Sequence, residues 1–170
     1  DYAFGKQWQE DATRFITAAG GKVLGQALHP LNGTDFSSQL LQAQASGAKV
    51  IGIANSGSDL ANVIKQAQEF GITKKGQKLA PLGLLINAVH GIGLDATQGL
   101  VMSTAAYWNA NDETRAFTKR YSAAMGGKIP NEAQLVTPSA VTHYLKSVAA
   151  AGSDEGDAVM KKMREIPVSD

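Results

Sequence analysis

Residues 47–71, which read GAKVIGIANSGSDLANVIKQAQEFG, constrain the fold more than any other part of the chain. They start with a short β-branched run that contains Val50, Ile51 and Ile53, as strands commonly do. A small polar turn follows, and apolar residues then recur at spacings of three and four, which is typical of one face of a helix. The apolar helix positions are Leu60, Val63, Ile64, Ala67 and Phe70. The stretch therefore predicts a strand, a turn and a helix, which together form the repeating unit of an α/β sheet.

The turn of this unit carries signals for the start of the helix. Ser56 and Asp59 have the spacing of a capping box, in which the hydroxyl accepts from an early helix N–H and the carboxylate reaches back. Gly71 stands where a left-handed helix end costs least. The turn thus opens on a helix N-terminus, whose backbone N–H groups face whatever lies above the strand.

Three more strands are predicted on either side of this unit. Their ranges are Lys22–Leu28, Pro81–Ile86 and Leu100–Thr104. Loops rich in Gly, Pro or Asn follow the first two of them, at residues 29–34 and 87–93. Alternating strands and helices of these lengths predict an α/β fold class, a Rossmann-like, largely parallel sheet with helices on both faces.

The pattern becomes purely helical in the last third of the chain. One helix is predicted to start at Asn111 or Asp112, a second at Thr137–Pro138, with proline at its first position, and a third after a Ser153 cap. We therefore predict two parts, an α/β ligand-binding lobe over residues 1–110 and a helical segment over residues 111–170.

In a parallel sheet, the loops that follow the strands emerge at one carboxyl edge, and ligands bind there. Four segments are expected to converge at this edge. They are residues 1–5, 29–34, 54–58 and 87–93. This convergence predicts a binding site on the lobe.

Composition and motifs exclude several classes of function. With a net charge of +1 and scattered lysines and arginines, the chain has no electrostatic footprint for nucleic acid. No apolar run approaches the roughly 20 residues of a membrane-spanning helix. The chain contains no cysteine, which excludes disulfides, thiolate ligands and a cysteine nucleophile.

Enzyme and metal chemistry are poorly supported at the predicted edge. His29 and His90 lie there without a nearby acidic cluster, which makes a poor metal site, so neither metal nor cofactor is expected. There is no G-x-S-x-G motif and no complete G-x-G-x-x-G after a strand. We expect a binding protein and not an enzyme; the alternative in the enzyme class is a nucleotide-dependent α/β enzyme.

Several motifs occur in an order that resembles a known family. They are DYAFG at 1–5, GTDF at 33–36, QAQEFG at 66–71, GL at 99–100, PN at 130–131 and AGS at 151–153. With these motifs the chain resembles, over essentially its whole length, the type I periplasmic solute-binding proteins of ABC importers, the leucine/isoleucine/valine-binding-like receptors. Each motif is weak alone, but the ordered set is specific.

The resemblance implies a two-lobed receptor that closes on its solute by a hinge motion. The chain resembles the second lobe, a type I periplasmic-binding-protein lobe, with helices that in the family pack partly on the first lobe. The resemblance also implies that the first lobe, the strand before Asp1 and the closing strands after Asp170 are absent. We therefore expect exposed apolar faces, with residues 138–170 packed non-natively, swung out, or swapped in a dimer.

The resemblance also implies which residues meet the solute. It points to Phe4, to Asn55 and Ser56, and to the neighbourhood of Asn87. Tyr2 and Phe4 either stack on a ligand or staple onto the first helix, and both readings stay open. With His90 from the predicted edge, the predicted site residues are Tyr2, Phe4, Asn55, Ser56, Asn87 and His90.

The solute class is constrained by a missing carboxylate. No Asp or Glu lies between Glu69 and Asp95, where the family's amino-acid binders are expected to hold a ligand ammonium. Because an unpaired buried ammonium is costly, an aromatic or branched carboxylic or keto acid is favoured over a branched-chain amino acid.

The resemblance implies an extracytoplasmic solute-binding component of an ABC importer, located in the periplasm or outside the cell. Its expected partners are the small-molecule solute and an ABC permease, with no nucleic acid. A ligand-sensing domain of a regulator or receptor with the same fold is the alternative within the binding class.

Overall fold

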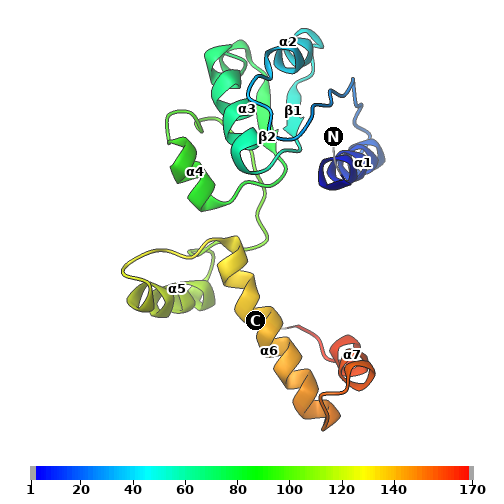
Figure 1. Ribbon diagram of the computed structural model, residues 1–170, viewed down its shortest axis with the longest axis vertical. Coiled ribbons are helices and arrows are strands. Elements are labelled where there is room, and N and C mark those ends of the chain that lie inside the picture. Colours follow the sequence, from blue (N-terminus) through cyan, green and yellow to red (C-terminus); the bar gives the residue numbers. More distant parts are fainter. Residues whose placement is uncertain (1–2, 169–170) are drawn as a thin grey trace. The chain divides into compact units, whose positions relative to one another are not determined.

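The computed structural model describes residues 3–168, which form two compact units (Figure 1). The first unit ends at Ser103 and the second begins at Thr104. The first contains α1 (Ala3–Ala18), α2 (Ser37–Ala45), β1 (Val50–Ile53), α3 (Gly57–Glu69), the 3-10 helix η1 (Thr73–Lys75), β2 (Lys78–Pro81) and α4 (Ile86–Ile92). The second contains α5 (Asp112–Ala124), α6 (Glu132–Ala151) and α7 (Gly156–Glu165).

The first unit is built on a parallel pair of strands. β1 and β2 pair from Val50 opposite Lys78 to Ile53 opposite Pro81, and α3 is part of the crossover between them. Helices lie on both sides of this small sheet, which confirms the predicted α/β class. The strand, turn and helix predicted within residues 47–71 are therefore present.

The core of this unit gathers around α3. Its buried apolar side chains are Phe36, Leu40, Ile53, Leu60, Val63, Ile64, Ala67, Ile72, Leu79 and Leu84. The buried face of α3 is the one that the spacing of three and four predicts. Burial of these side chains supplies the main driving force for folding this unit.

Strand β2 lies earlier in the chain than predicted, so the assignment of Pro81–Ile86 was wrong. Leu79 is completely buried while Lys78 is exposed, so only one face of the strand is covered. Because Lys78 interrupts the apolar run, the sequence pattern does not indicate a strand at this position. The predicted loop at residues 87–93 is also wrong, because helix α4 occupies it. Ala88, Val89 and Ile92 of α4 pack on the core at helical spacing.

The predicted strand Leu100–Thr104 contributes a single ladder bond. The Val101 N–H donates to the Leu79 carbonyl at 2.9 Å. In a parallel ladder the next bond along this edge would need an N–H from Pro81, which proline lacks. This explains why the segment runs beside β2 without extending the sheet.

The predicted strand Lys22–Leu28 is also not observed. Residues 22–28 have no regular secondary structure, and Val23, Leu24 and Leu28 are exposed. A β-branched, apolar run becomes a strand only where a neighbouring strand accepts its hydrogen bonds. Among the described residues, β1 pairs with β2 and not with this segment.

Two helices of the second unit, α5 and α6, begin at capping boxes. Asn111 accepts from the Thr114 N–H at 2.8 Å, which confirms the predicted start of α5. Asn131 accepts from the Gln134 N–H at 3.0 Å, so α6 starts before the predicted Thr137–Pro138 and contains Pro138 in its interior. The earlier Asn cap, together with Gln134, sets the start of α6 despite the cost of an internal proline.

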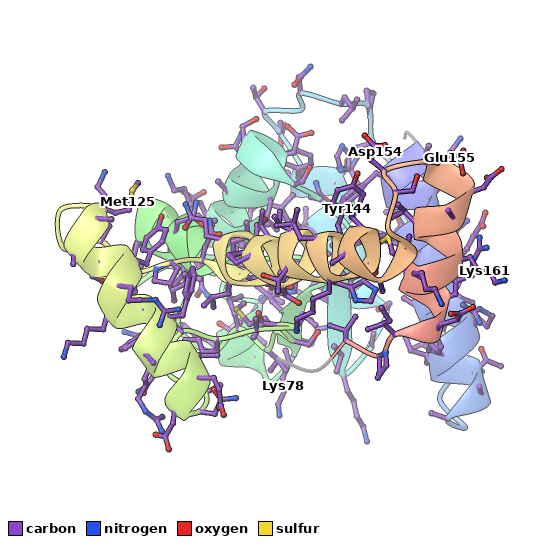
Figure 2. The ribbon with its side chains drawn as sticks, turned by 90° about the horizontal axis from the view of Figure 1, so that it is seen from below. Lys78, Met125, Tyr144, Asp154, Glu155 and Lys161 are labelled. Carbon is purple, nitrogen blue, oxygen red and sulfur yellow. The ribbon has the colours of Figure 1, made fainter. Side chains whose placement is uncertain are left out.

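Helices α6 and α7 pack against each other around Val159 and Ser147. Asp154 and Glu155 lie in the turn between them (Figure 2). Glu155, and not the predicted Ser153, caps α7, because its carboxylate accepts from the Ala158 N–H at 3.1 Å. Within the described part of the chain, no helix is both long and apolar enough to cross a bilayer.

Candidate ligand-binding site

The first turns of α1 pack beside the carboxyl ends of both strands. A Cβ atom on Gly5 would lie 3.4 Å from the carbonyl oxygen of Ala54, the residue that follows β1. A Cβ atom on Gly83, two residues after β2, would overlap the indole ring of Trp8. The Phe4 and Trp8 rings lie 4.4 Å apart between centroids. The start of α1 thus brings an aromatic pair to the edge where the sequence predicts a site.

Asn55 is held at this edge by a histidine from another loop. Asn55 Nδ2 and His29 Nε2 are 2.8 Å apart, and His29 Nδ1 lies 2.7 Å from the Pro30 carbonyl oxygen. Because a carbonyl only accepts, His29 Nδ1 carries the proton and Nε2 accepts from Asn55. The contacts therefore fit the imidazole tautomer that carries its proton on Nδ1. Besides this contact, the Asn55 amide has an oxygen acceptor and a second N–H donor.

His29 was placed at the edge by the sequence but was not among the predicted site residues. Its ring also meets the Phe36 ring edge-on, with centroids 4.7 Å apart and an angle of 81° between the ring planes. The pairing with Asn55 joins residues 26 positions apart. The only signal in the sequence was that both residues follow predicted strands.

Ser56 is the N-cap residue of α3 and is exposed. The predicted capping box with Asp59 is wrong, because the Ser56 side chain makes no cap bond to the helix. The Asp59 carboxylate instead accepts from the Asn32 N–H at 3.0 Å, and Asp59 is 5% exposed. Ser56 therefore stays at the edge beside Asn55, while Asp59 turns towards the loop at residues 29–34.

Asn87 and His90 lie one turn apart on α4 and are both exposed. The opposite side of α4 packs on the core, so these two side chains face away from it. Their assignment rests on their place after β2 and not on a contact with Asn55. Tyr2 lies outside the described residues.

The carboxylates of Asp35 and Asp59, which lie close in sequence to His29 and Asn55, are engaged by the protein itself. Asp59 binds the Asn32 N–H, and Asp35 accepts from Ser37 Oγ at 2.5 Å and from the Ser37 N–H at 2.9 Å. These bonds, the hydroxyl first, lower the pKa of the Asp35 carboxyl. Between residues 28 and 60 the chain has no other acidic residue. The described loops 29–34 and 54–58 thus present neutral hydrogen-bonding groups.

The hollows found on the first unit lie elsewhere. One runs between α1 and residues 23–26, and another lies beside the end of α3 and residues 95–99. Neither is lined by a predicted site residue. The described residues also hold no group of three histidine, aspartate or glutamate side chains placed for a metal ion. These two hollows therefore do not coincide with the predicted site.

An α/β lobe with polar groups at the carboxyl edge of its parallel strands is typical of proteins that bind small ligands at that edge. The chain matches the periplasmic binding protein family over residues 1–170, and it belongs to that family. This confirms the resemblance to type I periplasmic binding proteins. The family and the solved structures that resemble the chain are solute-binding proteins and not enzymes.

Solved structures agree with the assignment. A periplasmic binding protein from Burkholderia mallei is 49% identical, with a TM-score of 0.88. A branched chain amino acid ABC transporter periplasmic ligand-binding protein from Burkholderia xenovorans LB400 is 40% identical, with a TM-score of 0.86. The comparison covers 100% of this chain and 45% of each of those chains.

An amino acid ABC transporter substrate-binding protein from Pseudomonas fluorescens Pf-5 is 26% identical, with a TM-score of 0.79. That comparison covers 94% of this chain and 43% of the Pseudomonas chain. This chain therefore spans about half the length of the solved proteins that it matches. No curated protein sequence matched it.

Proposed function

We propose that this chain is one lobe of the extracytoplasmic solute-binding component of an ABC importer, and that its edge around Phe4, Asn55 and His29 contacts the solute. The observation that carries the proposal is the meeting of these groups beside the carboxyl end of β1. The membership in the periplasmic binding protein family supports a location in the periplasm or outside the cell.

The proposed solute is a small organic acid without an α-amino group, such as an aromatic or branched carboxylic or keto acid. An ammonium group needs a carboxylate or several acceptors, and Asp35 and Asp59 are already bound within the lobe. Asn55 and His29 instead form a polar rim without a carboxylate, and Phe4 with Trp8 adds an apolar surface. The competing solute is a branched-chain amino acid, which the likeness to the 40% identical branched chain amino acid transporter protein of Burkholderia xenovorans favours.

A matched pair of solutes separates these readings. Calorimetric titration of the full-length receptor with 4-methyl-2-oxopentanoate and with leucine compares the same carbon skeleton with and without the amino group. Benzoate tests the aromatic acids. Tighter binding of either acid than of leucine supports the proposal. Tighter binding of leucine overturns the solute class while leaving the receptor assignment in place.

The proposed partner is an ABC permease that senses closure of the receptor. Membrane vesicles that contain the cognate ABC permease should accumulate the solute only when the receptor is added. An Asn55→Ala receptor should lower both solute affinity and uptake, whereas a Gln68→Ala receptor, changed on the same lobe but on α3, should lower neither. Equal uptake without added receptor would contradict this role.

A further inference from the structure

We propose that three side chains on one face of α3, those of Asp59, Asn62 and Gln66, form a clip that positions His29 against Asn55 and thereby sets the affinity of the candidate site. The proposal rests on the proposed function, in which Asn55 contacts the solute. The three residues stand at spacings of three and four, so they share one face of the helix.

Each member of the clip bonds to the backbone of the loop that follows His29. Asp59 accepts from the Asn32 N–H at 3.0 Å, and Asn62 Nδ2 donates to the Gly33 carbonyl at 3.4 Å. Gln66 makes two bonds of 2.8 Å: its Nε2 donates to the Thr34 carbonyl and its Oε1 accepts from the Phe36 N–H. The clip thus satisfies backbone groups that an irregular loop cannot pair by itself.

Among the three residues of the clip, Gln66 is the one whose two hydrogen bonds no other side-chain type can make. It donates to one backbone group and accepts from another, so it needs an amide of this length. A glutamate of the same shape would keep the bond from the Phe36 N–H. It would also place a carboxylate oxygen against the Thr34 carbonyl, which repels it. Gln66→Glu is therefore a change in hydrogen bonding at nearly constant volume.

The clip reaches the site through Phe36. The Phe36 ring is buried beneath the loop, where a Cβ on Gly33 would come within 2.8 Å of it, so both residue types are needed for this packing. The same ring supports the His29 imidazole edge-on. A shift of the Phe36 backbone would therefore move the ring on which His29 rests and would lengthen the contact between His29 and Asn55.

Asp59 holds the other end of the loop. Asn32 has a φ of 60°, in the left-handed region, which asparagine tolerates better than most residues. The bond from its N–H to Asp59 fixes this conformation. The second carboxylate oxygen of Asp59 is buried without a hydrogen-bond partner, a costly arrangement that the loop bond offsets only in part.

The clip is tested first without any solute. Long-range ¹H–¹⁵N spectra of the full-length receptor should show His29 as the neutral form with the proton on Nδ1. Gln66→Glu should change this signature to a mixture of tautomers. Gln68→Glu, a matched change on the same helix whose side chain bonds to the Gln98 carbonyl, should preserve it. Identical His29 spectra in the two variants would overturn the proposal.

The binding arm uses 4-methyl-2-oxopentanoate and benzoate as probes. Gln66→Glu should weaken whichever probe binds by about tenfold, or about 1.4 kcal/mol, and Gln68→Glu by less than about twofold. Asn62→Ala, which removes the longest bond, should act in the same direction with a smaller effect, and circular dichroism checks that each variant is folded. Equal affinities in both glutamate variants would overturn the link to the site. If neither probe binds the unaltered receptor, the proposed solute class fails while the spectra still decide the clip.

Discussion

The two units of the chain are held together in different ways. The first buries a continuous core of ten apolar side chains around α3 and β2. In the second, the described apolar side chains are mostly exposed, and Val159 is buried where α7 packs on α6. Its helices are defined by local signals, the capping boxes of Asn111 and Asn131. The comparison teaches that the candidate site sits on the unit whose geometry is fixed by packing.

The largest expected effect contrasts a buried with an exposed leucine. Leu79 is completely buried in the first unit, and Leu145 is 58% exposed on α6. Leu79→Ala should lower the free energy of unfolding of the 170-residue chain by about 2–5 kcal/mol, through lost burial and a cavity. Leu145→Ala should change it by less than about 0.5 kcal/mol. Urea titration followed by circular dichroism measures both, and similar losses would show that the second unit has a core of its own.

The next effect tests the packing of α1 at the candidate site. Gly83→Ala should destabilise the first unit by about 1–3 kcal/mol, because the new methyl group overlaps the Trp8 ring. Gly91→Ala is the matched control, since a Cβ there meets open space within α4 and should be neutral or slightly stabilising. The tryptophan emission of the Gly83 variant should also shift. Equal stability of the two variants would mean that α1 does not pack on this edge.

How much of the fold the sequence could predict follows from the same contrast. The period of three and four along α3 and the Asn111 cap are local signals, and both predictions are confirmed. The strand predictions were wrong at segments where strand formation depends on a partner strand. Residues 22–28 have no partner strand among the described residues, and Pro81 interrupts the ladder beside Val101. An apolar run shows that a segment can be a strand, but not that a partner is present.

The candidate site was predictable at the level of segments and not of contacts. The rule that loops after parallel strands share an edge placed Asn55 and His29 together in outline. It could not show that their side chains pair. It also could not show that the Asp59 carboxylate accepts from the Asn32 N–H and does not form a capping box with Ser56. Both choices depend on the conformation of a loop 26 or more residues away in the sequence.

A smaller effect is expected at the caps of the second unit. Asn131→Ala removes the side chain that accepts from the Gln134 N–H, and it should lower stability by about 1 kcal/mol. Asn131→Asp, which keeps an accepting oxygen and suits a helix N-terminus, should lose much less. Thermal unfolding followed at 222 nm compares the two. If the alanine variant matches the unaltered chain, then α6 is set by packing and not by its cap.

The smallest effect compares one exposed carboxylate from each unit at acid pH. Hydrogen bonds from Ser37 lower the pKa of the Asp35 carboxyl from its ordinary value, and a hydrogen bond from Lys162 lowers that of the Glu165 carboxyl. A carboxyl whose pKa is lower in the folded chain than in the unfolded chain stabilises the fold at pH values above its unfolded-state pKa. This stabilisation is lost as the pH falls through its folded-state pKa. Asp35→Asn should therefore weaken the fall in stability below about pH 4, whereas Glu165→Gln should do so from a slightly higher pH.

Added salt separates the contributions of the two carboxylates further. Screening should reduce the Glu165 contribution, which comes from a solvent-exposed ion pair, more than that of Asp35, whose partners are an uncharged hydroxyl and a backbone N–H. Unfolding curves between about pH 2 and 6 at low and high salt test this order, and an equal salt response would show that Asp35 is also stabilised by a distant positive charge.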